Sequence, residues 1–207
     1  MMYMDTNKTS NRFELDPSLK AHVLEVSRPS SDDVRMNLSK LCEDLGIEVF
    51  NFDFTDKHIS GAIARDKVSN TWKIFVRAGD SPRRKRFTVA HELGHYFSYV
   101  NNSKSKVYID DATDGIIKDY AIMLRSDVME QPQHKAAELE ANEIAAELLM
   151  PETAVSDFFK QGKTVEEMAD AFVVSESAMT VRLLNLGYKM MEQPSEQQAC
   201  DQVPSNT

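Results

Sequence analysis

The residues His91-Glu92-Leu93-Gly94-His95 constrain this chain more than any other feature, because they match the pattern H-E-x-x-H. On an α-helix, positions i and i+4 lie on one face one turn apart, so the two imidazoles can bind one metal ion. Glu92 lies beside them, where a general base must be to take a proton from a zinc-bound water. The pattern predicts a helix built for metal-assisted hydrolysis of a peptide bond. The alternative interpretation is two ordinary histidines on an exposed helix.

The flanking residues favour a helix. Ser81 suits the N-cap and Pro82 the first helical position. Apolar residues recur at helical spacing and define a buried face beside the two histidines: Phe87, Ala90, Leu93, Phe97 and Val100. Gly94 costs about 1 kcal/mol of helix propensity relative to Ala. A Gly between the two histidines is therefore expected where another backbone comes close.

A catalytic zinc site needs a third protein ligand. The metzincin pattern does not supply one, because Ser98 and Asn101 stand where it requires Gly and His. The remaining common solution is a carboxylate from a later helix, and residues 135–150 are rich in helix formers and end at Pro151. Four of them form an apolar seam that lets another helix pack closely: Ala141, Ala145, Leu148 and Leu149. His134 stays open as a third ligand, since His commonly binds zinc.

Two blocks resemble the ImmA/IrrE-type metallopeptidases. The first is RFTVAHELGHY, residues 86–96, and the second is ELEANEIAAELLMP, residues 138–151, which is similar to the family's E-x-x-A-N-x-x-A-x-x-L-L-x-P helix. The resemblance covers about residues 34–187, and Ile144 stands where the family often has Phe. It implies that Glu138 is the third zinc ligand beside His91 and His95. It also implies a protein substrate, namely a helix-turn-helix transcriptional repressor encoded nearby.

Charge and composition narrow the function. The net charge of −9 argues against broad nucleic-acid binding. The only basic cluster is residues 83–86, at the start of the zinc helix, which is either a solvated turn paired with nearby carboxylates or a substrate contact beside the cleft. No stretch is typical of a signal peptide or membrane span, and Cys42 and Cys200 do not form a disulfide framework. We therefore predict a cytoplasmic protein, with Cys42 on an apolar helix face.

The order of elements predicts an α+β fold with a zincin-like core, in which a small sheet packs on the H-E-x-x-H helix and a second ligand helix. Helices are expected at 17–27 and 33–45, and strands at Ile47–Phe52, Ile59–Ala64 and Trp72–Ala78. We place this domain at residues 16–151, a helical segment at 152–190, and disorder at 1–15 and 191–207. Between the two ligand blocks, Val107–Ile109 is a possible strand, and Tyr108 or Tyr120 could stabilise the oxyanion, although nothing selects either.

The segment after Pro151 predicts three short helices similar to a helix-turn-helix. Thr164 and Glu167 form a capping box, and Ser175 caps the last helix. One hypothesis is DNA binding through Ser177, Thr180 and Arg182, but a DNA-reading helix usually carries more basic and amide side chains. The favoured hypothesis is docking of a protein partner. Its candidate residues are apolar, and some of them must instead form the core of the segment: Met168, Phe172, Val174 and Met179.

Two functional hypotheses follow. In the first, the chain is a zinc endopeptidase in which His91, His95 and Glu138 hold zinc and Glu92 is the general base. In the second, it is a non-proteolytic regulator or toxin–antitoxin component that binds a partner repressor without cutting it. Both keep the same fold, and the oligomeric state is left open.

Overall fold

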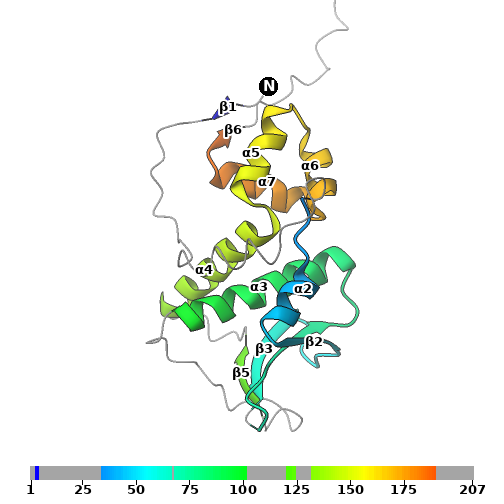
Figure 1. Cartoon of the computed structure of the whole chain (residues 1–207), viewed down its shortest axis with the longest axis vertical. Helices are drawn as coiled ribbons and strands as arrows, with labels where there is room; N and C mark the ends of the chain where they lie inside the picture. Colours follow the sequence, from blue (N-terminus) through cyan, green and yellow to red (C-terminus); the bar gives the residue numbers. More distant parts are fainter. Residues whose placement is uncertain (1–2, 5–33, 67, 102–119, 125–131, 190–207) are drawn as a thin grey trace, which may run out of the picture.

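The computed structural model describes residues 3–4, 34–66, 68–101, 120–124 and 132–189 (Figure 1). In chain order, the strands are β1 (Tyr3–Met4), β2 (Ile47–Phe52), β3 (Gly61–Asp66), β4 (Trp72–Arg77), β5 (Tyr120–Leu124) and β6 (Tyr188–Lys189). The helices are α2 (Leu38–Asp44), α3 (Pro82–Asn101), α4 (Pro132–Leu149), α5 (Glu152–Lys160), α6 (Val165–Phe172) and α7 (Glu176–Asn185). The chain therefore has the predicted α+β composition. Within these ranges, no helix combines the length and apolar character needed to cross a bilayer.

Four strands form one mixed sheet in the order β2-β4-β3-β5. β2 runs parallel to β4, whereas β3 is antiparallel to both of its neighbours. Three of these strands match the predicted ones to within two residues at each end. β5 was not predicted, because its five residues show no apolar–polar alternation. It is a strand because it pairs with β3. The predicted helix at 17–27 and strand at Val107–Ile109 lie outside the described residues.

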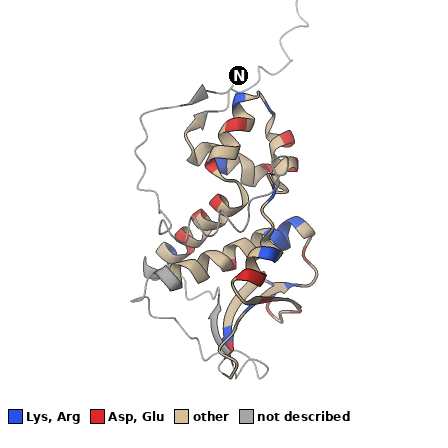
Figure 2. Ribbon diagram, viewed as in Figure 1, with Lys and Arg blue, Asp and Glu red and all other residues tan. Residues whose placement is uncertain are grey.

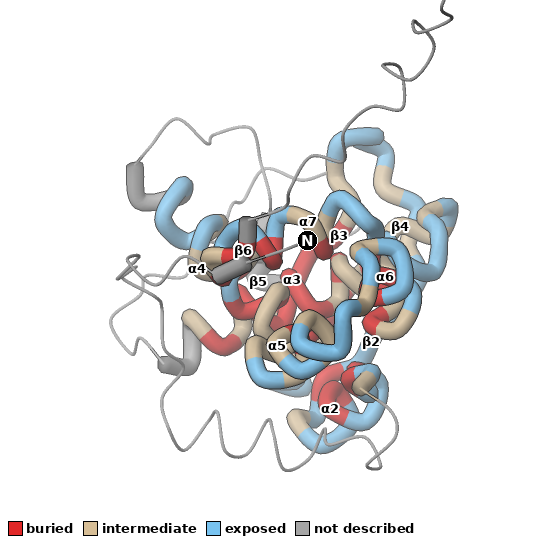
Figure 3. The backbone as a smooth tube through the Cα atoms, turned by 90° about the horizontal axis from the view of Figure 1, so that it is seen from above, coloured by how far each residue is buried: buried red, intermediate tan, exposed pale blue. Residues whose placement is uncertain are grey.

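α3 packs against one face of the sheet and is covered on its other side by α4 and the C-terminal part of the chain (Figures 1 and 3). It begins as predicted, since Ser81 Oγ accepts a hydrogen bond from the Arg84 amide at 3.3 Å. Its predicted apolar face is buried at Ala90, Leu93 and Phe97. The seam predicted for α4 is buried as well, at Ala141, Ala145, Leu148 and Leu149. The two helices that carry the predicted ligands thus pack on each other in the core.

Gly94 is the point of closest approach between α3 and α4. A Cβ atom built on it would lie 2.5 Å from the carbonyl oxygen of Ala141 and 2.8 Å from its Cα. Both atoms belong to backbone, so neither can rotate away. The expectation that another backbone comes close to Gly94 is confirmed.

Replacing Gly94 with Ala is therefore expected to destabilise the protein, although Ala is the better helix former. Helix propensity favours Ala by about 1 kcal/mol. Overpacking a tight core costs about 1–3 kcal/mol and here forces two helices apart, so we expect a net loss of free energy of unfolding. Urea denaturation measures it. Gly79→Ala is the matched control, since a Cβ at Gly79 meets nothing within 4 Å. A Gly94→Ala protein as stable as the wild type would show that the helices separate at no cost.

The C-terminal helices α5–α7 share their core with the rest of the chain. A single cluster of buried apolar residues extends from Met36 to Tyr188. The predicted capping box is present, with Thr164 N donating to Glu167 Oε2 at 2.8 Å and Glu167 N donating to Thr164 Oγ1 at 3.1 Å. Ser175 caps α7 as predicted, through a hydrogen bond from the Ala178 amide.

Residues named for each of the two hypotheses about these helices are buried. Arg182, named for DNA contact, is buried, and its Nε donates to the Met150 carbonyl at 2.9 Å while its Nη2 binds Glu147. The proposed docking residues are also buried, because they form the core under α6 and α7: Met168, Phe172, Val174 and Met179. The large apolar side chains that α7 exposes are Val181 and Leu184.

Smaller features complete the fold. Tyr3–Met4, inside the segment predicted to be disordered, pairs antiparallel with Tyr188–Lys189 and forms a two-stranded sheet. The remainder of 1–15 and all of 191–207 lie outside the described residues. Cys42 is buried on α2 as predicted, and burial raises the pKa of its thiol to about 11.

Candidate metal centre and active site

Three side chains bring their ligand atoms together between α3 and α4. His91 Nε2 and His95 Nε2 are 3.1 Å apart, since the i, i+4 spacing stacks the two residues on one face of α3. From α4, Glu138 places Oε1 3.1 Å from His95 Nε2 and Oε2 3.4 Å from His91 Nε2. These are the three ligands named from the sequence. His134 also lies in α4, but its side chain is outside the described part of the chain.

The geometry and chemistry of this cluster fit a metal ion. Donors bound tetrahedrally to zinc at about 2.0–2.1 Å lie about 3.3 Å from one another. The three separations here are between 3.1 and 3.4 Å. Imidazole nitrogen and carboxylate oxygen are common ligands of zinc and of several transition metals. His91, His95 and Glu138 could therefore hold one ion.

The charge state of Glu138 suits a ligand. Burial by itself would raise the pKa of this carboxyl group. The hydrogen bonds and charges of His91 and His95 outweigh burial and hold the pKa of Glu138 below its ordinary value. The side chain is therefore an ionised carboxylate at neutral pH, as metal binding requires.

Asn142 orients the first histidine. Its Oδ1 lies 3.0 Å from His91 Nδ1. An amide oxygen only accepts hydrogen bonds, so Nδ1 carries a hydrogen, and Nε2, which faces His95 and Glu138, is the nitrogen left to bind a metal. No role for Asn142 was predicted from the sequence. The signal was its position one turn after Glu138, on the same side of α4.

Loss of this contact should weaken metal binding without removing a ligand. For Asn142→Ala we expect metal affinity to fall about 10-fold to 100-fold, the usual effect of removing a hydrogen-bond partner of a ligating histidine. Competition against a chromogenic chelator measures the affinity. Asn142→Asp, which can accept the same hydrogen bond, should retain most of it. Glu143→Ala is the control on the exposed side of α4, and equal affinity in all three variants would contradict this role.

Glu92 lies beside the ligand cluster and does not belong to it. The side chain is 3% exposed. A Cβ built on Gly61, in β3, would approach Glu92 Oε1 to 2.9 Å, so this strand lies directly against the carboxylate. The position fits the predicted general base, which must be near the ligands and shielded from bulk water.

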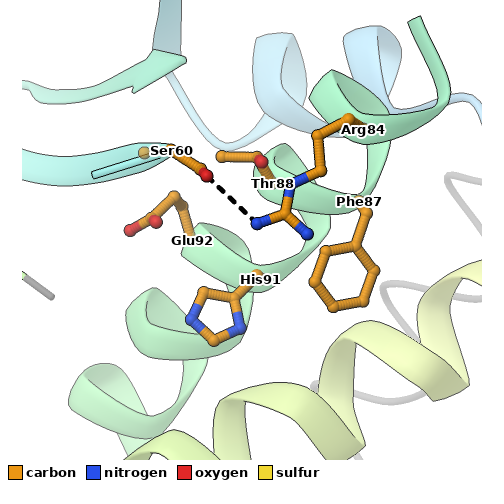
Figure 4. A pocket seen from close by; sticks show the side chains of 7 residues that line it. Ser60, Arg84, Phe87, Thr88, His91 and Glu92 are labelled. Carbon is orange, nitrogen blue, oxygen red and sulfur yellow. Dashed lines mark hydrogen bonds between the residues drawn. The ribbon is translucent and has the colours of Figure 1, made fainter. Parts of the chain in front are cut away.

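A pocket opens next to Glu92 and the first histidine, between the end of the β2–β3 connection and the start of α3 (Figure 4). The residues that line it are Ser60, Gly61, Arg84, Phe87, Thr88, His91 and Glu92. The space is small, so a polypeptide segment would lie across it and pass the proposed base and one proposed ligand. Tyr108 and the side chain of Tyr120, the two candidates for oxyanion stabilisation, lie outside the described part.

The basic cluster at the start of α3 has more than one role (Figure 2). Arg83 pairs with Asp170 at 2.6 Å and donates to the Val174 carbonyl at 2.9 Å, so it ties α3 to the C-terminal helices. Lys85 donates to Asn51 Oδ1 at 2.7 Å. Arg84 instead lines the pocket. Of the two interpretations of this cluster, pairing with a carboxylate applies to Arg83. Arg84 lies at the pocket, where the other interpretation places a substrate contact.

Comparison with known proteins agrees with the site. A peptidase family model described as the IrrE N-terminal-like domain matches residues 42–184, a range that contains His91, His95 and Glu138. A search of curated proteins found no match.

Proposed function

Because the chain belongs to the peptidase family described as the IrrE N-terminal-like domain, we propose that it is a zinc-dependent endopeptidase. The observation that carries this proposal is the meeting of His91 Nε2, His95 Nε2 and a Glu138 carboxylate oxygen at one point, with Glu92 buried beside them. Two imidazoles and one carboxylate would hold zinc with three protein ligands, the number found in catalytic zinc sites.

The residues divide the chemistry as follows. When bound, zinc acts as a Lewis acid that polarises the scissile carbonyl and lowers the pKa of a bound water to about 7. Glu92 accepts a proton from the attacking water and passes it to the nitrogen of the leaving amine. Asn142 holds His91 in the tautomer that presents Nε2. Burial of Glu92 keeps the transferred proton away from bulk solvent.

For the substrate, we propose a helix-turn-helix transcriptional repressor encoded nearby, cut in the cytoplasm to derepress mobile-element, prophage or stress genes. The resemblance to ImmA/IrrE-type peptidases supports this class of substrate. The net charge of −9 and the burial of Arg182 support protein contact in preference to DNA contact by the C-terminal helices. We infer that these helices form a helix-turn-helix-like segment that docks the partner.

The direct test is co-expression with each helix-turn-helix repressor encoded in the neighbourhood, followed by mass analysis of fragments. We expect one defined cut with the wild-type chain and none with Glu92→Gln. If the wild type and Glu92→Gln both inactivate a repressor and neither produces a fragment, the chain is a regulator that works by binding and not a peptidase.

The docking role has its own expected result. Val181 and Leu184 are 55% and 50% exposed on α7, so Val181→Asp with Leu184→Asp removes apolar contact area without opening the core. We expect slower cleavage of the whole repressor and unchanged cleavage of a short peptide spanning its cut site, because only the protein reaches a remote surface. Val68→Asp, at a side chain 90% exposed, is the control. Equal rates on the whole repressor would place docking elsewhere.

A further inference from the structure

Arg84 is held at the rim of the pocket by two neighbours. Its Nη2 donates a hydrogen bond to Ser60 Oγ at 3.0 Å, and its Cζ lies 5.8 Å from the centre of the Phe87 ring. Figure 4 shows the guanidinium between these two side chains, with Glu92 drawn on the far side of Ser60. A contact with a hydroxyl and one with a ring orient the cation without neutralising it.

The charge of Arg84 is available for a ligand. Within the described ranges, the guanidinium of Arg84 contacts Ser60 and Phe87, and neither supplies a carboxylate. Arg83, the adjacent arginine, is already paired with Asp170. A guanidinium offers five N–H donors in a planar fork that matches a carboxylate with two parallel hydrogen bonds. An exposed guanidinium that lines the same pocket as the proposed base, in a chain of net charge −9, is thus suited to an acidic group.

The position of Glu92 indicates which part of a substrate meets this cation. In the proposed reaction, Glu92 gives its proton to the leaving nitrogen, so that nitrogen must come within hydrogen-bond reach of its carboxylate. The residue that carries the nitrogen therefore lies on the Glu92 side of the scissile bond. The pocket shares Glu92 and His91 with the site, so the side chain of that residue would lie over it, on the side where Arg84 stands.

We propose that Arg84 is a specificity-determining residue that binds a substrate carboxylate on the leaving-amine side of the scissile bond. The inference rests on the proposed peptidase function and adds a preference for acidic substrates to it. The carboxylate can come from an Asp or Glu side chain that follows the cut, or from a free C-terminus close to it. Phe87 offers an apolar surface to the methylene groups of such a side chain.

The test is cleavage of a degenerate peptide library by the zinc-loaded full-length protein, with sequencing of the products from their new N-termini. We expect wild type to enrich Glu and Asp after the cut. On single peptides that differ only as Glu or Gln there, we expect kcat/KM to be about 10-fold higher for Glu, the effect of one hydrogen-bonded charge. Arg84→Gln should remove this preference, and Arg84→Glu should shift it towards Lys and Arg.

Lys85→Gln is the matched control, because it removes a neighbouring cation that contacts Asn51 and does not line the pocket. It should keep the acidic preference. Libraries with amidated and free C-termini separate the two sources, since only a C-terminal carboxylate is lost on amidation. The same comparison is made in any repressor found by co-expression, with Glu or Gln placed directly after its cut site.

The outcomes separate the inference from the function on which it rests. Cleavage without acidic preference, or with a preference that Arg84→Gln leaves unchanged, overturns the role of Arg84 and leaves the peptidase intact. No cleavage of peptides or repressor overturns the peptidase itself, and the inference with it.

Discussion

Glu92→Gln is expected to lower peptidase activity about 10²-fold to 10⁴-fold, the usual contribution of general acid–base catalysis. Gln has nearly the same size as Glu, so it fits the buried space against Gly61. It cannot accept and return a proton at neutral pH. Since Glu92 is outside the ligand cluster, zinc content should not change. Initial rates on the repressor or on a peptide spanning its cut site measure the effect.

Zinc analysis and thermal unfolding of the same protein are the controls. A variant that retains both and loses activity places Glu92 in the chemistry. A variant with wild-type cleavage rates removes Glu92 from the mechanism. If cells show full derepression with Glu92→Gln, the regulator works by binding.

Removal of a ligand should have the second large effect. Protein purified without chelator should carry about one zinc per chain. His91→Ala or Glu138→Ala leaves two of the three ligands, so bound zinc should fall far below one per chain and activity should disappear with it. Elemental analysis measures the metal directly, and rates after added zinc show whether weak binding is rescued.

The controls for this result test the ligand set residue by residue. Glu143→Ala removes an exposed carboxylate from the same helix and should keep full zinc. His134→Ala should keep it too. If Glu138→Ala retains zinc while His134→Ala loses it, the third ligand is His134 and the assignment of Glu138 is wrong.

Local features of this protein could be predicted from the sequence because their causes are local. The H-E-x-x-H spacing places His91 and His95 on one face of any helix that contains them. Ser81, the Thr164–Glu167 capping box and Ser175 begin helices through bonds to amides within three residues. The close packing at Gly94 could also be predicted, because a glycine inside a helix lowers stability and is expected where another backbone comes close.

Features that depend on contacts between distant segments were decided by the tertiary structure. β5 exists through its ladder with β3, since its five residues are a short apolar run that could equally belong to a buried helix. Arg182 and the apolar residues of α6 and α7 have the sequence features of a binding surface, but packing turns them inward, where Arg182 meets the end of α4. The roles of Asn142 and Arg84 likewise appear when α4 packs beside α3 and when Ser60 lies beside the start of α3. Helix periodicity defines which residues share a face, whereas the partner of that face depends on the whole chain.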